Sequence, residues 1–174
     1  QMCIRDRTGT MSAALGGIVG IFEMPNTNPL TTTPEALEHK IKRGTETAYT
    51  DFAYYFGGTF ENSKNLPSWE KLDGVCGIKI FMGASTGNLL SATDEEVEAV
   101  VANGNRVIAV HAEDEFLMNE NKKTILKDSN DVGMHCKWRD VNSSLNATKR
   151  VVSLAKKHNR LSLIHISEPT RLRR

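Results

Sequence analysis

The fold is decided by Gly77-Ile78-Lys79-Ile80-Phe81, a short apolar run interrupted by one lysine. Side chains alternate between the two faces of a β-strand, so the two isoleucines share one face and the lysine lies on the other. Isoleucine and phenylalanine are typical of strands, and a stretch rich in small residues follows directly. The pattern predicts a strand that packs its isoleucines against helices and turns its lysine towards the opposite side of the sheet.

Three further apolar runs have the length and composition of strands, namely Gly17–Met24, Asp51–Phe56 and Val107–His111. The ends of the four runs recur at intervals close to the roughly 30 residues of one βα unit. The sequence therefore predicts an α/β fold, a partial (β/α)8 TIM barrel with about half of the barrel present. A doubly wound sheet has a similar rhythm, but no glycine-rich phosphate-binding loop follows the first strand, which disfavours a nucleotide-binding fold.

Helices are predicted between these strands. One begins at Pro34, because proline is favoured in the first turn, and it presents Leu37 and Ile41 on one face. Another begins after Thr93, which has the spacing of a capping box with Glu96. Further helices are predicted within two later ranges, Glu113–Lys127 and Leu145–Asn159.

The composition is that of an ordinary globular chain of one domain: 174 residues, 39% hydrophobic and 25% charged, with a formal net charge of +1. Lys and Arg are interspersed with Asp and Glu, so the charge pattern favours neither nucleic acid nor a membrane surface as a partner. No apolar run approaches the roughly 20 residues of a membrane span. The cysteines, Cys3, Cys76 and Cys136, lack metal-ligand spacing, which indicates reduced thiols in a cytoplasmic protein.

The two ends of the chain are related at the level of DNA. One DNA stretch encodes Met2–Asp6 on one strand and Leu161–His165 on the complementary strand. It resembles the transposon end used to prepare sequencing libraries, so residues 1–7 and 161–174 are predicted to be translated adapter. The natural segment is then 8–160, an internal piece of a longer protein that forms part of a barrel.

Two residues at predicted strand ends are candidate metal ligands. A buried Lys79 would have a lowered pKa and would react with carbon dioxide to give a carbamate, an anion able to bridge two metal ions. The alternative is an ordinary lysine at an exposed strand edge. His111 ends an apolar run, where an imidazole suits zinc, although such a histidine is often a hydrogen-bonded structural residue. The acidic residues that follow His111 either cap the next helix or act chemically.

The remaining candidates are weaker. His39 and His158 lie among charged residues and are expected on the surface, and His135 belongs to a predicted loop that is a lesser candidate for covering the site. His165 lies in an apolar run but is rejected as a site residue because it belongs to the adapter segment. Asn26, in a proline-bounded turn after the first strand, either hydrogen-bonds a polar substrate or is part of an ordinary turn.

Three motifs carry a family resemblance: Gly16–Pro29, Gly77–Asn88 and Val110–Asp114. In order and spacing they resemble three segments of the dihydroorotases, which are cyclic amidohydrolases of the amidohydrolase superfamily. In that family the first segment follows the first metal-binding motif. The second contains the carbamylated lysine, and the third contains the next metal-ligand strand. The similarity extends through 8–160, including a His-x-x-x-Arg pattern at His135 and Arg139.

The resemblance implies a hydrolase that acts on carbon–nitrogen bonds in cyclic amides. Lys79 would be the carbamylated bridging ligand, His111 a ligand of one metal, and Asn26 a contact to the substrate carboxylate. Two zinc ions would activate water and polarise the ring amide carbonyl. The small-molecule reaction would be the reversible closure of N-carbamoyl-aspartate to dihydroorotate in pyrimidine biosynthesis, in a protein that forms a homo-oligomer when full length.

The resemblance also implies parts outside 8–160. The paired histidines of the first strand would precede Thr8, while a later histidine and the proton-shuttle aspartate would follow Arg160, so no catalytic residue is assigned within the chain. The chain itself is therefore expected to be inactive, and an open half-barrel with unpaired strand edges is expected to aggregate or fold poorly. The alternatives are an allantoinase, hydantoinase or dihydropyrimidinase, and a non-catalytic dihydroorotase-like subunit.

Overall fold

Five parallel strands form one sheet in the order β1-β2-β3-β4-β5, so each strand pairs with the next one along the chain. The structure, a computed structural model, describes residues 2–83, 87–125, 131–160 and 162–165. The strands are β1 (Gly20–Glu23), β2 (Asp51–Gly57), β3 (Val75–Phe81), β4 (Ile108–His111) and β5 (Ser162–His165).

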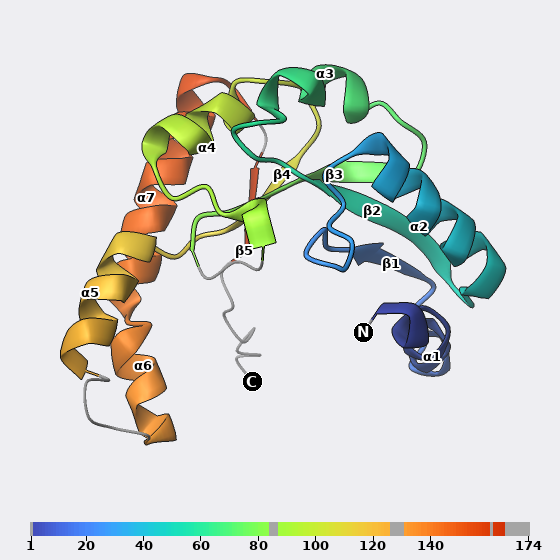
Figure 1. The fold of residues 1–174 in the computed structure, drawn as a ribbon, viewed down its shortest axis with the longest axis horizontal. Coiled ribbons are helices and arrows are strands. Elements are labelled where there is room, and N and C mark those ends of the chain that lie inside the picture. Colours follow the sequence, from blue (N-terminus) through green and yellow to red (C-terminus); the bar gives the residue numbers. More distant parts are fainter. Residues whose placement is uncertain (1, 84–86, 126–130, 161, 166–174) are drawn as a thin grey trace, which may run out of the picture.

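Figure 1 shows the sheet curling into an arch with helices along its outer side. The helices are α1 (Met2–Leu15), α2 (Pro34–Thr47), α3 (Leu66–Trp69), α4 (Asp94–Val101), α5 (Glu115–Ile125), α6 (His135–Trp138) and α7 (Val141–Lys157), and short 3-10 turns cover Ser63–Asn65, Gly87–Leu89 and Val132–Met134. Parallel strands that alternate with helices and curl in one direction are the geometry of a (β/α)8 barrel. The predicted half-barrel is confirmed.

The predicted helix starts are also confirmed. Thr33 caps α2 by accepting a hydrogen bond from the backbone N–H of Ala36, and proline occupies the first turn. Thr93 and Glu96 form the reciprocal capping box of α4. Each cap satisfies backbone N–H groups that have no partner inside the helix.

Both faces of β3 are covered, in the alternation that the sequence predicts. Ile78 and Ile80 are fully buried in the core between the sheet and the outer helices. Lys79 lies on the opposite, inner face, where its partners in the strand register are Gly57 on β2 and Ala109 on β4. The sheet therefore carries an apolar core on its outer side and brings the chemically reactive groups to its inner side.

Some elements differ from the prediction. β1 is shorter than Gly17–Met24 because Gly17, at φ 83°, ends α1 and directs the chain away from the helix. α1 has no apolar stripe that would reveal it in the sequence, and it crosses the predicted boundary between residues 7 and 8. β5 is formed by residues of the predicted adapter segment, and the assignment of that segment remains a prediction.

A buried ion pair at the amino-terminal side of the sheet connects three parts of the chain. Arg160 and Glu70 are 7% and 1% exposed, and the guanidinium Nη2 lies 3.2 Å from Oε2 of the carboxylate. Arg160 also donates to the carbonyl oxygens of Asn103 and Arg106, each at 2.8 Å. Glu70 accepts from the backbone N–H groups of Asn105 and Arg106. The pair thus links α3, the loop before β4 and the end of the chain segment that follows α7.

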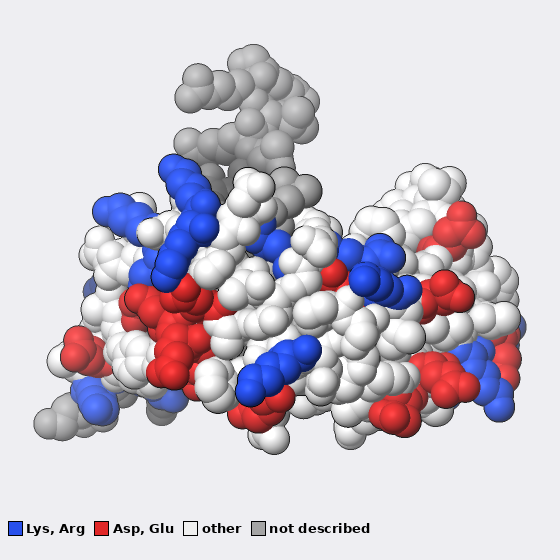
Figure 2. Space-filling view, turned by 90° about the horizontal axis from the view of Figure 1, so that it is seen from above, with Lys and Arg blue, Asp and Glu red and all other residues white. Residues whose placement is uncertain are grey.

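The surface carries charges of both signs. On the face shown in Figure 2, Lys and Arg side chains lie beside Asp and Glu side chains. The ion pairs of the described residues include Arg150 with Asp94 and Lys157 with Glu98, each at 2.6 Å between nitrogen and oxygen. Of the helices that the structure describes, none has the length and apolar content needed to cross a membrane.

Candidate metal-binding site at the strand ends

Lys79 lies near the carboxyl end of β3, where a barrel of this kind assembles its functional site. Its side chain is 2% exposed, and Nζ lies 4.9 Å from the centre of the Phe81 ring. Burial lowers the pKa of Lys79 to about 8, because the apolar surroundings disfavour the charged amine. Lys79 is therefore not a solvent-exposed lysine on an edge strand, and a fraction of its amine is neutral near physiological pH.

His111 ends β4, the strand next to Lys79, and its ring is partly exposed. The Nε2 atom lies 2.5 Å from Oε2 of Glu113, and the ring centre lies 6.1 Å from that of Phe81. Glu113 is also held by Arg139, whose Nε donates to Oε1 at 2.9 Å and whose Nη2 donates to Oε2. His111 is thus the first member of a chain of three polar side chains.

The electrostatics of Glu113 follow from these two partners. Burial by itself would raise the pKa of this carboxyl, but the hydrogen bonds from His111 and Arg139 and the positive charge of Arg139 outweigh it. Together they lower the pKa of Glu113 to about 2. The group is therefore an ionised carboxylate at neutral pH, and it presents negative charge to the histidine ring.

Asn26 lies in the turn that follows β1, two strands away from Lys79. The turn is closed by backbone hydrogen bonds from Thr27 and Thr31 to the carbonyl oxygen of Pro25, and it is tied to β2 by a bond from Gly57 to Thr31. Thr27 is buried while Asn26 is exposed, so the asparagine side chain is available to solvent. Asn26 shares the carboxyl edge of the sheet with Lys79 and His111 but belongs to a different part of it.

The other histidines have separate places. His39 is exposed on α2, and His158 pairs with Glu98 at 2.7 Å on the outer helices. His135 is exposed and begins α6, so the prediction of a loop at this position was wrong. Its ring packs against Trp138, with 5.8 Å between ring centres. The backbone register places His165 beside His111, at the end of β5.

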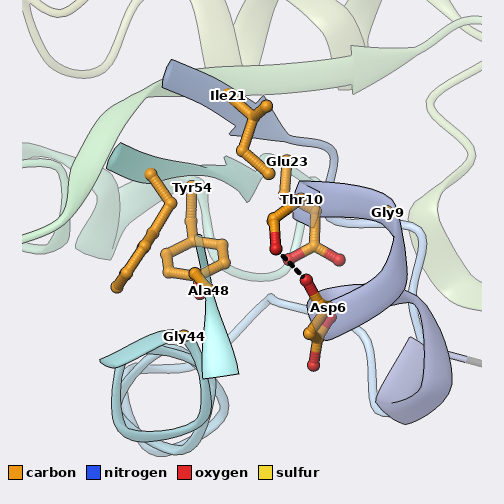
Figure 3. Close-up of a pocket in the computed structure, with 9 residues that line it drawn as sticks. Asp6, Gly9, Thr10, Ile21, Glu23, Gly44, Ala48 and Tyr54 are labelled. Carbon is orange, nitrogen blue, oxygen red and sulfur yellow. Dashed lines mark hydrogen bonds between the residues drawn. The ribbon is translucent and has the colours of Figure 1, made fainter. Parts of the chain in front are cut away.

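A separate pocket of about 240 Å³ lies on the helix side of the sheet (Figure 3). It is enclosed by α1, α2, β1 and β2, with Ile21, Phe52 and Tyr54 among its apolar walls and Glu23 and Asp6 among its polar ones. Part of its lining comes from residues 1–7, the predicted adapter. The pocket lies on the face opposite to Lys79 and is not part of the strand-end site.

Within the part of the chain that the structure describes, no three His, Cys, Asp or Glu side chains gather in a way that would hold a metal ion. Two members of the predicted ligand set, Lys79 and His111, lie on one face of neighbouring strands. Sequence reasoning missed the pairing of Glu113 with Arg139, because these residues are 26 positions apart and follow no periodic pattern. The helix-capping role falls to Asp114, which accepts from the N–H groups of Phe116 and Leu117.

The sequence of this chain is similar to those of known enzymes. No protein-family model matches the chain. The chain is 34% identical over 166 residues to an L-hydantoinase of Paenarthrobacter aurescens, which covers 91% of the chain and 36% of that protein. It is also 34% identical over 165 residues to a dihydroorotase of Methanosphaera stadtmanae, which covers 92% of the chain and 37% of that protein.

The fold of this chain is also similar to that of a solved structure. The solved structure of an L-hydantoinase (dihydropyrimidinase) from Arthrobacter aurescens matches with a TM-score of 0.85 and 30% sequence identity, covering 95% of this chain and 38% of that one. The chain thus spans a little over a third of the length of the relatives it matches. Sequence and fold together show that the chain belongs to the cyclic amidohydrolases of the amidohydrolase superfamily.

Proposed function

We propose that this chain is part of a dihydroorotase, a metal-dependent hydrolase that interconverts N-carbamoyl-aspartate and dihydroorotate. The observation that carries the proposal is the buried amine of Lys79, with its lowered pKa, on the strand next to His111. The relative from Methanosphaera stadtmanae, named a dihydroorotase, supports the choice of substrate. The turn from Met24 to Pro29, which resembles that of dihydroorotases, supports it further.

In this proposal Lys79 becomes a carbamate. The neutral amine attacks carbon dioxide, a nitrogen–carbon bond forms, and the nitrogen loses a proton to give an anion. Desolvation favours this step because it raises the neutral fraction of the amine at neutral pH. The residues beside Lys79 in the register, Gly57 and Ala109, add little or no side-chain bulk of their own.

The Lys79 carbamate and the His111 imidazole suit divalent metal ions, and we propose that the complete protein holds two zinc ions with their help. When bound, the ions would lower the pKa of water and polarise the amide carbonyl. The remaining ligands and the proton-shuttle aspartate are expected before Thr8 and after Arg160. On its own, the 174-residue chain is therefore proposed to be inactive.

Asn26 is proposed to bind the substrate. Its exposed side-chain amide donates hydrogen bonds, which suits the carboxylate shared by N-carbamoyl-aspartate and dihydroorotate. Its turn is tied to β2 through Gly57 and Thr31, so the amide is carried on a supported loop at the strand-end edge. We further propose that the complete protein is a cytoplasmic homo-oligomer, which size-exclusion chromatography with light scattering would test.

A second candidate is a hydantoinase. The chain is as similar to the L-hydantoinase of Paenarthrobacter aurescens as to the dihydroorotase, at 34% identity in both cases. The fold match to an L-hydantoinase structure favours the same reading. Both enzymes would use Lys79 and His111 in the same way, so the two candidates differ in the cyclic amide and not in the metal chemistry.

The test is to recover the complete gene, using DNA that encodes residues 16–160 as the probe, and to assay the purified protein. Dihydroorotate, a 5-substituted hydantoin and allantoin are offered separately, with Lys79→Ala as the inactive variant and Lys64→Ala, at an exposed site, as the matched control. Fastest turnover of dihydroorotate is expected. Preference for the hydantoin would establish the second candidate, and no turnover of any substrate would leave a non-catalytic subunit. The recovered gene is also expected to lack residues 1–7 and 161–174.

A further inference from the structure

His111, Glu113 and Arg139 form a connected polar group at the end of β4. Their side chains are 29%, 14% and 24% exposed, so water has limited access to the contacts between them. Arg139 binds both carboxylate oxygens of Glu113, and Oε2 of the same carboxylate lies 2.5 Å from Nε2 of His111. A bidentate arginine fixes both the position and the plane of a carboxylate.

Glu113 is directed towards the histidine and not towards the helix that follows it. Two N-terminal N–H groups of α5, those of Phe116 and Leu117, donate to the side chain of Asp114, the next residue along the chain. The Glu113 carboxylate is therefore left to bind side chains at the strand end. This division of roles between two adjacent acidic residues gives Glu113 a function other than helix capping.

Arg139 is itself held firmly. It directly follows α6, and its backbone N–H donates to the carbonyl of His135. The preceding Trp138 donates from its indole N–H to Met118 on α5, and its carbonyl accepts from Asn121 on the same helix. Two hydrogen bonds to α5 thus fix the segment that carries the guanidinium.

The contact between His111 and Glu113 determines which ring nitrogen carries hydrogen. With both oxygens bound by an arginine, the carboxyl group is ionised and offers only lone pairs. An unprotonated Nε2 would repel it at 2.5 Å, so Nε2 carries the proton and donates. The Nη2 atom of Arg139 also lies 3.4 Å from Nε2, which is a longer and weaker contact.

We propose that Glu113 and Arg139 are positioning residues that hold the His111 ring in one orientation, with Nε2–H donated to the carboxylate. Carboxylates that hold histidines in this way fix the orientation and the tautomer of the ring. The inference rests on the proposed function for the role of His111, and it adds the two residues that orient this side chain.

The test is nuclear magnetic resonance of the 174-residue chain labelled with ¹⁵N-histidine, without metal, bicarbonate or substrate. A His111→Gln variant assigns the signal. An exchange-protected proton on Nε2 of His111 is expected in the unaltered chain, since a ring free in water exchanges this proton too fast for detection. A protected proton on Nδ1, or no protected ring proton at His111, would overturn the proposal without recourse to any variant.

Three variants separate positioning from a general structural role. Glu113→Ala is expected to abolish the protected Nε2 proton, Arg139→Ala to weaken its protection, and Arg139→Lys to restore part of it. Glu98→Ala is the matched control, because Glu98 pairs with His158 at 2.7 Å and its loss should change only the His158 signals. Persistence of the His111 proton in Glu113→Ala would contradict the proposal. Because the readout needs neither metal nor turnover, its outcome is independent of whether the complete protein opens dihydroorotate.

Discussion

Lys79 and His111 lie on the same face of two neighbouring parallel strands, with His111 two positions further towards the carboxyl end. Phe81, the register partner of His111, lies beside both of them, 4.9 Å from the lysine nitrogen and 6.1 Å from the imidazole centre. The pKa of the lysine amine is lowered because burial disfavours its charged form. This burial leads to two predictions about the chemistry of Lys79.

Replacing Lys79 with methionine should stabilise the chain at neutral pH in buffer free of carbon dioxide. The pKa of Lys79 is lowered from 10.5 to about 8 in the folded state, so folding opposes protonation of this amine. The free-energy cost of burying the protonated amine is fully present below about pH 8. It declines as the folded state releases this proton, and it vanishes above about pH 10.5. Its size is on the order of 2–3 kcal/mol.

Urea denaturation at several pH values measures this difference. Lys79→Met should exceed the unaltered chain in free energy of unfolding at pH 7, and the gap should close as the pH rises. Lys64→Met, at an exposed lysine, is the control and should show no such gap. A gap of equal size at every pH would show that packing, and not the buried charge, sets the difference.

Bicarbonate should convert Lys79 to its carbamate. Only the neutral amine reacts with carbon dioxide, so conversion at a fixed concentration of dissolved carbon dioxide should rise as the pH passes through about 8. With ¹³C-labelled bicarbonate, a carbamate signal is expected in the carbon NMR spectrum of the unaltered chain. The signal should be absent from Lys79→Arg, whose guanidinium stays protonated. A signal that persists in Lys79→Arg would place the reaction at another amine.

The buried pair of Glu70 and Arg160 should contribute strongly to stability. Arg160→Leu leaves the Glu70 carboxylate buried with only two backbone donors, and loss of one member of such a pair costs about 3–5 kcal/mol. The matched control is Glu98→Gln, in the more exposed pair with Lys157, for which less than about 1 kcal/mol is expected. The midpoint of urea denaturation measures both, and equal shifts for the two variants would contradict the assignment.

The sequence predicts the elements whose signals are local. The alternation around Lys79, the proline after Thr33 and the capping box of Thr93 each depend on residues at most a few positions apart, and each is present in the structure. A parallel sheet also brings strand ends to one edge, so the placement of Lys79 near His111 follows once the strands are identified.

Other features depend on contacts between distant parts of the chain. Arg139 contacts Glu113, and the neighbouring Trp138 is bonded to α5, but nothing in the spacing of these residues indicates either contact. The late start of β1 follows from the positive φ of Gly17, which sequence alone does not distinguish from an ordinary strand glycine. Tertiary hydrogen bonds and backbone conformation therefore account for the missed parts of the site and the fold.

The outer edge of β1 should make the chain associate. This strand pairs only with β2 within the described sheet. Val19, directly before the strand, is 83% exposed, and Phe22, within it, is 66% exposed. An edge strand with unpaired backbone groups and exposed apolar side chains pairs readily with other chains. Light scattering should show the mean mass increasing with concentration, and Phe22→Lys should reduce the increase by adding a charge at that edge. Phe116→Lys, at a residue 56% exposed on α5, is the matched control and should leave association unchanged. If both lysine variants reduce association equally, net charge and not the β1 edge governs it.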